Sequence, residues 1–170
     1  MMVRLSALLC CALLVGCVGP YTSVVTVRHA EKQSGVSDPG LTAAGQRRAD
    51  ALRDHLADAR ANIVAVYSTD TRRTRNTAAP TAQSLGVPVR IYSSPEQLAA
   101  RIRAEHAGEA VLVVAHSNTL GLIVDAFGAD RPAAIPGTIS ENDYDNMVTV
   151  IVNGRGAAGA VHTTYGEESP

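Results

Sequence analysis

Two histidines in this sequence stand at the ends of largely apolar runs, a place where polar groups are unfavourable unless pairing or function compensates. The run VVTV is followed by Arg28 and His29, and the run AVLVVA is followed by His116. A third apolar run leads into YSTDTRRTRNTA, which supplies three further arginines: Arg72, Arg73 and Arg75. The arginine fork matches the oxygens of a phosphate, and amides of a helix starting after His116 would add anion-binding donors. These residues together predict a phosphate pocket that contains imidazole groups.

Imidazole beside guanidinium groups has a defined chemical use. Neighbouring positive charge disfavours protonation, so one histidine stays neutral and can attack phosphorus. A second histidine can donate a hydrogen bond to the phosphoryl oxygens on which charge develops. The residue types therefore predict nucleophilic attack on a phosphoryl group.

The elements that must position these residues alternate between strands and helices. Apolar residues that recur at three- and four-residue steps predict helices, and short β-branched runs predict strands. We expect strands at 24–27, 62–68, 87–92 and 110–116, helices at 42–60, 71–85, 95–106 and 119–127, and a terminal hairpin of strands 146–152 and 159–165 around NGRG. This order predicts an α/β fold, a three-layer α/β/α sandwich with a mostly parallel central sheet and an antiparallel edge hairpin. In open α/β sheets ligands bind beyond the carboxyl ends of the strands, where Arg28, His29 and His116 are expected.

The composition is that of an ordinary globular domain. The chain has 170 residues, 46% hydrophobic and 18% charged, with a formal net charge of −1. Such a length predicts one domain with a full hydrophobic core. A near-neutral balance lacks a basic stripe that releases counterions, and few aromatic rings are available for base stacking. Nucleic acid is therefore not expected as a partner.

The N-terminal residues are interpreted as an export signal rather than as part of the fold. Arg4 precedes an apolar run of fourteen residues, Leu5 to Val18, which is too short to span a bilayer and fits the core of a signal peptide. All three cysteines, Cys10, Cys11 and Cys17, lie here, so no disulfide or thiolate zinc site is expected downstream.

The segment LVGC at 14–17 resembles the lipobox of bacterial lipoproteins. This resemblance implies cleavage before Cys17 and acylation of that residue, and a plain secretory signal cut elsewhere is the alternative. We expect residues 1–17 to form the signal, 18–23 a short tether that reaches at most about 25 Å, and 24–170 the functional domain. The expected location is the periplasmic or extracytoplasmic face of a membrane, contacted only through the lipid anchor.

Three segments, VRHAEK, YSTDTRRTRNTA and VVAHSNT, resemble in order and spacing the motifs of the histidine phosphatase superfamily, which has the phosphoglycerate mutase-like fold. The segment DPGLTAAGQRRADAL is similar to the part that follows the first motif, so the resemblance covers residues 24–165. It implies that His29 is the nucleophile that becomes a phosphohistidine, with Arg28 binding phosphate beside it. Arg73 matches the second arginine, and His116 matches the second histidine, which hydrogen-bonds the phosphoryl group. No cofactor is implied.

The chain departs from the family pattern at three points. Ala30 stands where glycine is frequent, and Thr71 replaces the usual leucine, which we interpret as a neutral packing change. The acidic residue that protonates the leaving alcohol in many members has no clear counterpart, because the sequence leaves no room for a cap domain. Glu96 and Asp143 are the candidates, and Glu96 is also explained as a first-turn helix acid. Without such an acid, we expect a preference for substrates with activated leaving groups.

Other polar residues have simpler explanations. Ser117 and Asn118 are expected to cap a helix, with phosphate binding as the second interpretation. Arg72 and Arg75 rank below Arg73. A metal site of Glu31, His29 and His116 is disfavoured because the arginines would repel a dication. The remaining histidines are expected at the surface of the first helix, near the end of the third helix and in the hairpin: His55, His106 and His162.

The function expected from the sequence is that of a metal-independent phosphohydrolase that acts on a small or activated phosphorylated substrate through His29. A phosphomutase is one alternative, but it needs a site that retains phosphorylated intermediates. A lipoprotein that binds a phosphorylated ligand without turnover is the other. The natural substrate and the oligomeric state have no readable signal in the sequence.

Overall fold

A computed structural model describes residues 20–135 and 137–169. The elements follow one another as β1 (Thr22–Arg28), α1 (Ala43–Asp58), β2 (Ile63–Ser68), α2 (Arg72–Leu85), β3 (Val89–Ile91), α3 (Pro95–Glu105), β4 (Ala110–Ala115), α4 (Leu120–Ala126), β5 (Asn146–Val152) and β6 (Ala158–Thr164). The predicted signal, with Cys17 and its predicted acylation, and the first two residues of the predicted tether, 18 and 19, lie outside the described residues.

All six strands form one mixed sheet in the order β3-β2-β4-β1-β5-β6. The first four strands in this order run parallel to one another, and β5 and β6 complete the sheet in antiparallel pairing. The predicted α/β class, the mostly parallel sheet and the antiparallel edge hairpin are confirmed. Because β1 and β4 are adjacent and parallel, their carboxyl ends lie side by side.

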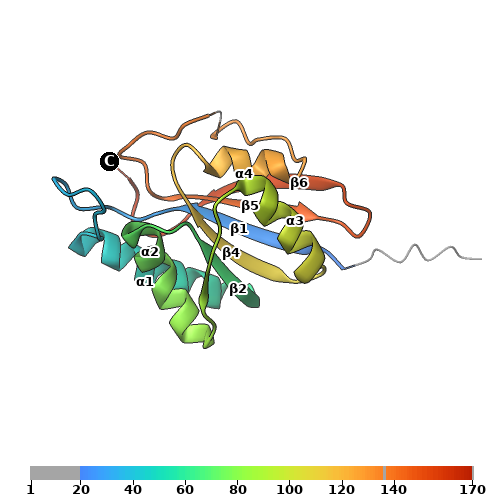
Figure 1. Ribbon diagram of the computed structural model, residues 1–170, viewed down its shortest axis with the longest axis horizontal. Helices are drawn as coiled ribbons and strands as arrows, with labels where there is room; N and C mark the ends of the chain where they lie inside the picture. The colour runs from blue at the N-terminus through green and yellow to red at the C-terminus, as the bar shows by residue number, and fades with distance from the viewer. Residues whose placement is uncertain (1–19, 136, 170) are drawn as a thin grey trace, which may run out of the picture.

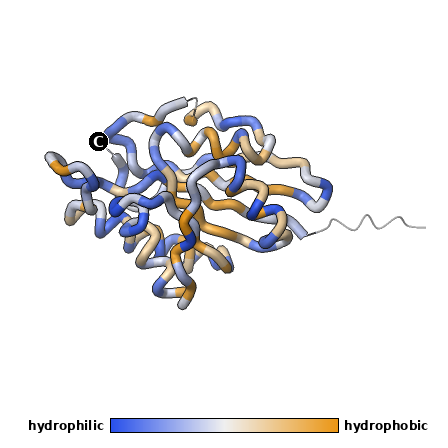
Figure 2. Tube along the Cα trace, in the orientation of Figure 1, coloured by the Kyte–Doolittle hydropathy of each residue, from blue (hydrophilic) through white to orange (hydrophobic). Residues whose placement is uncertain are grey.

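Helices cover both faces of the sheet, with α1 and α2 on one side and α3 and α4 on the other (Figure 1). Successive residues of the central strands lie on opposite faces of the sheet. Val24 belongs to the core under α3 and α4, and Val25 belongs to the core under α1 and α2. This explains why these strands are continuous apolar runs rather than alternating ones. The strands are accordingly coloured as hydrophobic and many of the loops at their ends as hydrophilic (Figure 2).

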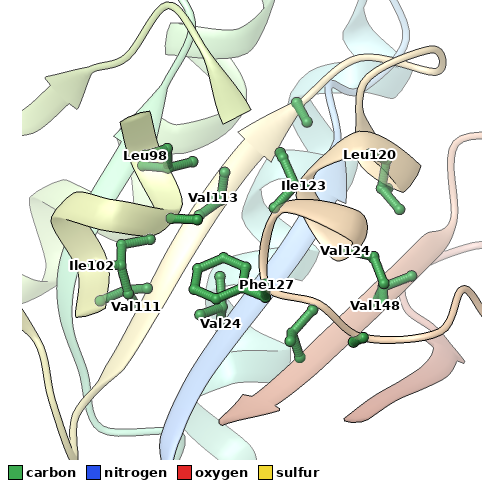
Figure 3. Packing of buried hydrophobic residues seen from close by; sticks show 14 of the residues in the cluster. Val24, Leu98, Ile102, Val111, Val113, Leu120, Ile123, Val124, Phe127 and Val148 are labelled. Atoms are coloured by element: carbon green, nitrogen blue, oxygen red, sulfur yellow. The ribbon is translucent and has the colours of Figure 1, made fainter. Parts of the chain in front are cut away.

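Phe127 is, after Tyr67, the largest buried side chain of the core under α3 and α4, and it lies among Val24, Ile102 and Val111 (Figure 3). The core therefore joins β1 and β4, the two strands whose ends carry the histidines, to the helices that cover them. Burial of this apolar surface contributes about 25 cal/mol per Å² and holds the helices on the sheet, while backbone hydrogen bonds keep the two strands side by side.

Most predicted elements are present, with shifts at their ends. β1 begins at Thr22, two residues before the predicted start, since Thr22 and Ser23 pair with Val152 and Ile151. Helix α3 begins as expected, with Ser94 as N-cap and Pro95 in the first turn, and Gly86 ends α2 in the left-handed region at φ 67°. No helix within the described ranges is both long and apolar enough to traverse a bilayer.

Candidate active site

The two motif histidines meet at the carboxyl ends of β1 and β4. Arg28 is in register with Ala115, and the backbone N–H of His29 donates to Ala115 O at 2.9 Å, which extends the parallel pairing past the end of β1. The rings of His29 and His116 lie edge to face, with their centroids 5.4 Å apart. The structure thus brings together two residues that are 87 positions apart in the sequence.

Arg73 reaches this pair from the first turn of α2, the helix that follows β2. Its Nη2 lies 3.4 Å from His116 Nδ1, and its side chain is 21% exposed. Thr77, one turn further along α2, accepts a hydrogen bond from Ala30 N and donates to Arg73 O. This buried hydroxyl therefore ties the arginine-bearing helix to the segment that carries His29.

His29 is oriented so that one ring nitrogen is available for chemistry. Its Nδ1 lies 2.8 Å from Ala30 O, and because a carbonyl only accepts, Nδ1 carries the proton and Nε2 is bare. Burial lowers the pKa of His29 to about 3, and the positive charges of Arg28 and Arg73 act in the same direction, whereas the bond to Ala30 opposes it. His29 is consequently a neutral imidazole, the form that a nucleophile requires.

His116 is also held neutral. Burial, followed by the positive charges of Arg73 and Arg28, lowers the pKa of His116 to about 4. Its Nε2 lies 2.9 Å from Thr69 Oγ1, at the end of β2. The dianion of a phosphate ester would offset the arginine charges and favour proton uptake by His116, which would turn this ring into a donor.

Arg28 is fully buried, and the chain folds a loop around its guanidinium. Nη1 donates to Ser140 O at 2.6 Å and to Asp143 O at 2.9 Å, and the ring of Tyr144 stacks on the guanidinium at 4.2 Å. The Nε–H groups of Arg28 and Arg73 are buried and have no hydrogen-bond partner among the described residues. Buried donors without a partner are rare, and the oxygens of a tetrahedral anion are the acceptors that suit them.

Sequence reasoning missed the contribution of Tyr144. Its ring centroid lies 6.2 Å from that of His29, in addition to its contact with Arg28. In the segment SENDYDN, the sequence predicts a role only for Asp143. No motif or periodicity in this loop signals that it packs on Arg28, because the contact joins residues more than 110 positions apart.

The two candidates for the general acid have opposite environments. Glu96 is exposed in the first turn of α3, where its carboxylate accepts a hydrogen bond from Ser94 Oγ, and this bond lowers the pKa of Glu96. Asp143 lies in the loop bound to Arg28. Partial burial, followed by a hydrogen bond with the Asp145 carboxyl, raises the pKa of Asp143, and a hydrogen bond donated by the Asn146 amide opposes this shift. A raised pKa keeps a proton available for donation, so the environment of Asp143 is the more suitable one.

The residues that the sequence ranks lower as phosphate ligands make other contacts or are exposed. Ser117 is buried and its carbonyl accepts from Ile139 N, while Asn118 is exposed, and the N-cap of α4 is Thr119 rather than either of them. Arg75 pairs with Asp70 at the surface, and the backbone N–H of Arg72 donates to Asp38. Thr71, predicted as a packing change, is the N-cap of α2.

Glu31 is paired with an arginine and does not form a metal site with the two histidines. Its carboxylate forms a salt bridge of 2.8 Å with Arg48 of α1. Within residues 20–135 and 137–169, no cluster of three or more His, Cys, Asp or Glu side chains is suited to hold a metal ion. Of the other histidines, His55 is exposed, His106 bonds Tyr67 and Glu109, and His162 bonds Asn146.

Comparison with known proteins shows that part of the chain is similar to one family. The family model of the histidine phosphatase superfamily (branch 1) matches residues 24–94, the part that holds Arg28, His29 and Arg73. A search of curated proteins gives no match.

Solved structures share the fold over most of the chain. The protein histidine phosphatase SixA, solved with tungstate, has a TM-score of 0.66 and 18% sequence identity, covering 87% of this chain and 97% of that one. A mycobacterial glucosyl-3-phosphoglycerate phosphatase has a TM-score of 0.65 and 14% identity, covering 85% and 98%. At these identities the likeness establishes the fold.

Proposed function

We propose that this chain belongs to branch 1 of the histidine phosphatase superfamily and that it hydrolyses phosphate esters or related phosphoryl compounds through a phosphohistidine on His29. The observation that carries this proposal is the pairing of two neutral imidazoles, 5.4 Å apart, with the guanidinium groups of Arg28 and Arg73. The match of residues 24–94 to the family supports the same activity.

The proposed reaction has two steps. The lone pair of His29 Nε2 forms a bond to phosphorus while the bond from phosphorus to the leaving group breaks, and the leaving group departs with a proton. Water then attacks phosphorus and gives a proton to the carboxylate that protonated the leaving group, the P–N bond breaks, inorganic phosphate is released and neutral His29 is regenerated. Arg28, Arg73 and protonated His116 would hold the phosphoryl oxygens as charge develops on them. These arginines would repel a divalent cation, and the proposed reaction uses no metal.

Asp143 is the proposed source of the leaving-group proton. Its backbone carbonyl is bound to Arg28, which places the residue beside the phosphate-binding guanidinium, and the pKa of its carboxyl is raised. An alkoxide needs this proton, whereas aryl phosphates, acyl phosphates and phosphoramidates have better leaving groups. The preference for activated substrates expected from the sequence then depends on how well Asp143 performs this role.

Phosphate release from p-nitrophenyl phosphate tests the proposal. We expect turnover by the wild-type protein, loss of at least about 10³-fold in His29→Asn because the nucleophile is removed, and no change in His55→Asn, whose side chain is exposed on α1. The same guanidinium groups would also suit a protein that binds a phosphorylated ligand without turnover. Tight phosphate binding without release of nitrophenol by the wild type would favour that alternative and overturn the proposal.

A phosphomutase is less well supported. The segment between β2 and β4 consists of α2, β3, α3 and their short connections, and these elements belong to the sheet and its covering layers (Figure 1). None of these elements is an insertion that could close over a phosphorylated intermediate, which a mutase must retain. We therefore favour release of phosphate to water.

A further inference from the structure

A chain of hydroxyl groups leads from His116 into the turn between β2 and α2. His116 Nε2 lies 2.9 Å from Thr69 Oγ1, and Thr69 Oγ1 lies 3.0 Å from Thr74 Oγ1. Thr74 Oγ1 in turn lies 3.0 Å from the carbonyl oxygens of Thr69 and Thr71. Thr74 is fully buried, whereas Thr69 and His116 are half-buried, so the inner end of the chain is shielded from solvent.

The hydrogen bonds give the chain one consistent direction. Thr74 Oγ1 has a single proton, and its acceptors are the carbonyl oxygens of Thr69 and Thr71 and also Thr71 Oγ1, which lies 2.8 Å away. With that proton used, Thr74 Oγ1 accepts from Thr69 Oγ1, whose own single proton is used in that bond. Thr69 Oγ1 then only accepts from His116, which places the proton of neutral His116 on Nε2.

The opposite nitrogen of His116 agrees with this assignment. Arg73 has only donors, and its Nη2 lies 3.4 Å from His116 Nδ1, so a bare Nδ1 suits it and a protonated Nδ1 does not. His29 has the reverse arrangement, with its proton on Nδ1, directed to Ala30 O. The two rings thus leave different nitrogens free: Nε2 in His29 and Nδ1 in His116.

We propose that Thr69 and Thr74 are positioning residues that hold His116 in the Nε2–H tautomer and direct its Nδ1 toward the phosphoryl site beside Arg73. This inference rests on the proposed function for its catalytic consequence, but the tautomer itself is a property of the free protein. With the ring fixed, a proton taken up at Nδ1 when a phosphoryl group binds is aimed at a phosphoryl oxygen without rotation of the ring. Thr74 acts only through Thr69, so it is not a catalytic residue.

The test combines NMR with kinetics on the full chain. In protein labelled with ¹⁵N in histidine, long-range ¹H–¹⁵N correlations report which ring nitrogen of each histidine carries the proton, and His116→Gln identifies the resonances of His116. We expect the Nε2–H tautomer of His116 in the wild type and a mixture of tautomers in Thr74→Val, which has similar volume but no hydroxyl. The kcat of Thr74→Val should fall about 10-fold, in the range for loss of an outer partner of a functional histidine.

Two further variants separate positioning from packing. Thr74→Ser keeps the hydroxyl and should retain the wild-type tautomer and most of the activity. Thr81→Val removes another buried hydroxyl of α2, one with no hydrogen-bond partner among the described residues, and should change neither. A wild-type spectrum with the Nδ1–H tautomer of His116, or an unchanged tautomer in Thr74→Val, overturns the inference. Because the spectrum needs no turnover, failure of the phosphatase proposal would be visible separately in the assay of His29→Asn.

Discussion

At the scale of single residues, the site depends on groups whose charge and orientation are set before a ligand arrives. The guanidinium of Arg28 is bound by two backbone carbonyls and covered by Tyr144, so it stays in place before a ligand arrives. The two imidazoles are neutral because burial and neighbouring arginines disfavour their protonated forms. Such preorganisation reduces the reorganisation needed when charge develops in a transition state.

Replacement of Asp143 by Asn tests its proposed role as proton donor. The variant keeps the backbone carbonyl that binds Arg28 but cannot donate a proton. We expect the kcat for a simple alkyl phosphate to fall about 10²-fold, because general acid catalysis is worth roughly 10²–10⁴-fold. The kcat for p-nitrophenyl phosphate should change little, since nitrophenolate leaves without protonation.

Glu96→Gln provides the matched control for this comparison. Its side chain is exposed and its carboxylate bonds Ser94, so we expect unchanged kcat with both substrates. Equal losses for both substrates in Asp143→Asn would instead indicate a structural role of Asp143 in the loop that binds Arg28.

At the scale of secondary-structure elements, the start of α1 packs directly on the segment after His29. Thr42, the N-cap of α1, donates its backbone N–H to Glu31 O, and its Oγ1 accepts from Gly45 N. A Cβ at position 45 would lie 2.3 Å from Glu31 O, a distance that no side chain tolerates. Gly45 is therefore required by the close approach of α1 to the backbone two residues beyond His29.

Gly45→Ala is expected to destabilise the protein by about 1–3 kcal/mol, as measured by urea unfolding, because the new methyl group must push the Glu31 segment away. It should also lower kcat, since that segment carries His29. Intrinsic helix propensity alone favours Ala over Gly by up to about 1 kcal/mol, so a gain in stability would contradict the account. Gly159→Ala, where no atom lies within 4 Å of the new Cβ, is the control and should be nearly neutral.

The parts of the site that the sequence predicts are those fixed by the ends of regular elements. Arg28, His29 and His116 follow apolar strands, and Arg73 begins a helix, so strand order and the position of ligands in α/β sheets suffice to group them. Tyr144 and the carbonyls that bind Arg28 belong to an irregular loop. The sequence of this loop has no helical or strand periodicity, so its packing on Arg28 could not be predicted. The hydroxyl chain of Thr69 and Thr74 was equally hidden, because threonine near a helix start is also common as a capping residue.

At the scale of the whole molecule, the site links catalysis to stability through its two neutral histidines. The pKa of His29 is lowered to about 3 and that of His116 to about 4, whereas histidine in an unfolded chain titrates near 6.5. As the pH falls below about 6.5, the unfolded chain binds protons at these positions and the folded protein does not. The free energy of unfolding must therefore decrease on acidification, until the folded protein itself binds these protons near pH 4 to 3.

Urea unfolding at pH 7 and pH 5 checks this linkage. We expect each of the two histidines to contribute a loss of up to about 2 kcal/mol between pH 6.5 and pH 5, from 1.36 kcal/mol per pH unit. The double variant His29→Gln/His116→Gln should show a correspondingly smaller pH dependence in the same range, whatever its stability at pH 7. The same pH dependence in both proteins would show that these histidines are not neutral in the folded state.

The central claim, attack of His29 on phosphorus, is tested most directly by trapping the covalent intermediate. The wild-type protein is mixed rapidly with a ³²P-labelled aryl phosphate and quenched in alkali, in which phosphohistidine survives, and the labelled peptide is identified by mass spectrometry. We expect an acid-labile phosphoryl group on His29, formed and lost at rates compatible with turnover and absent from His29→Asn. Turnover with no label on any histidine, or with the label on His116, would contradict the account.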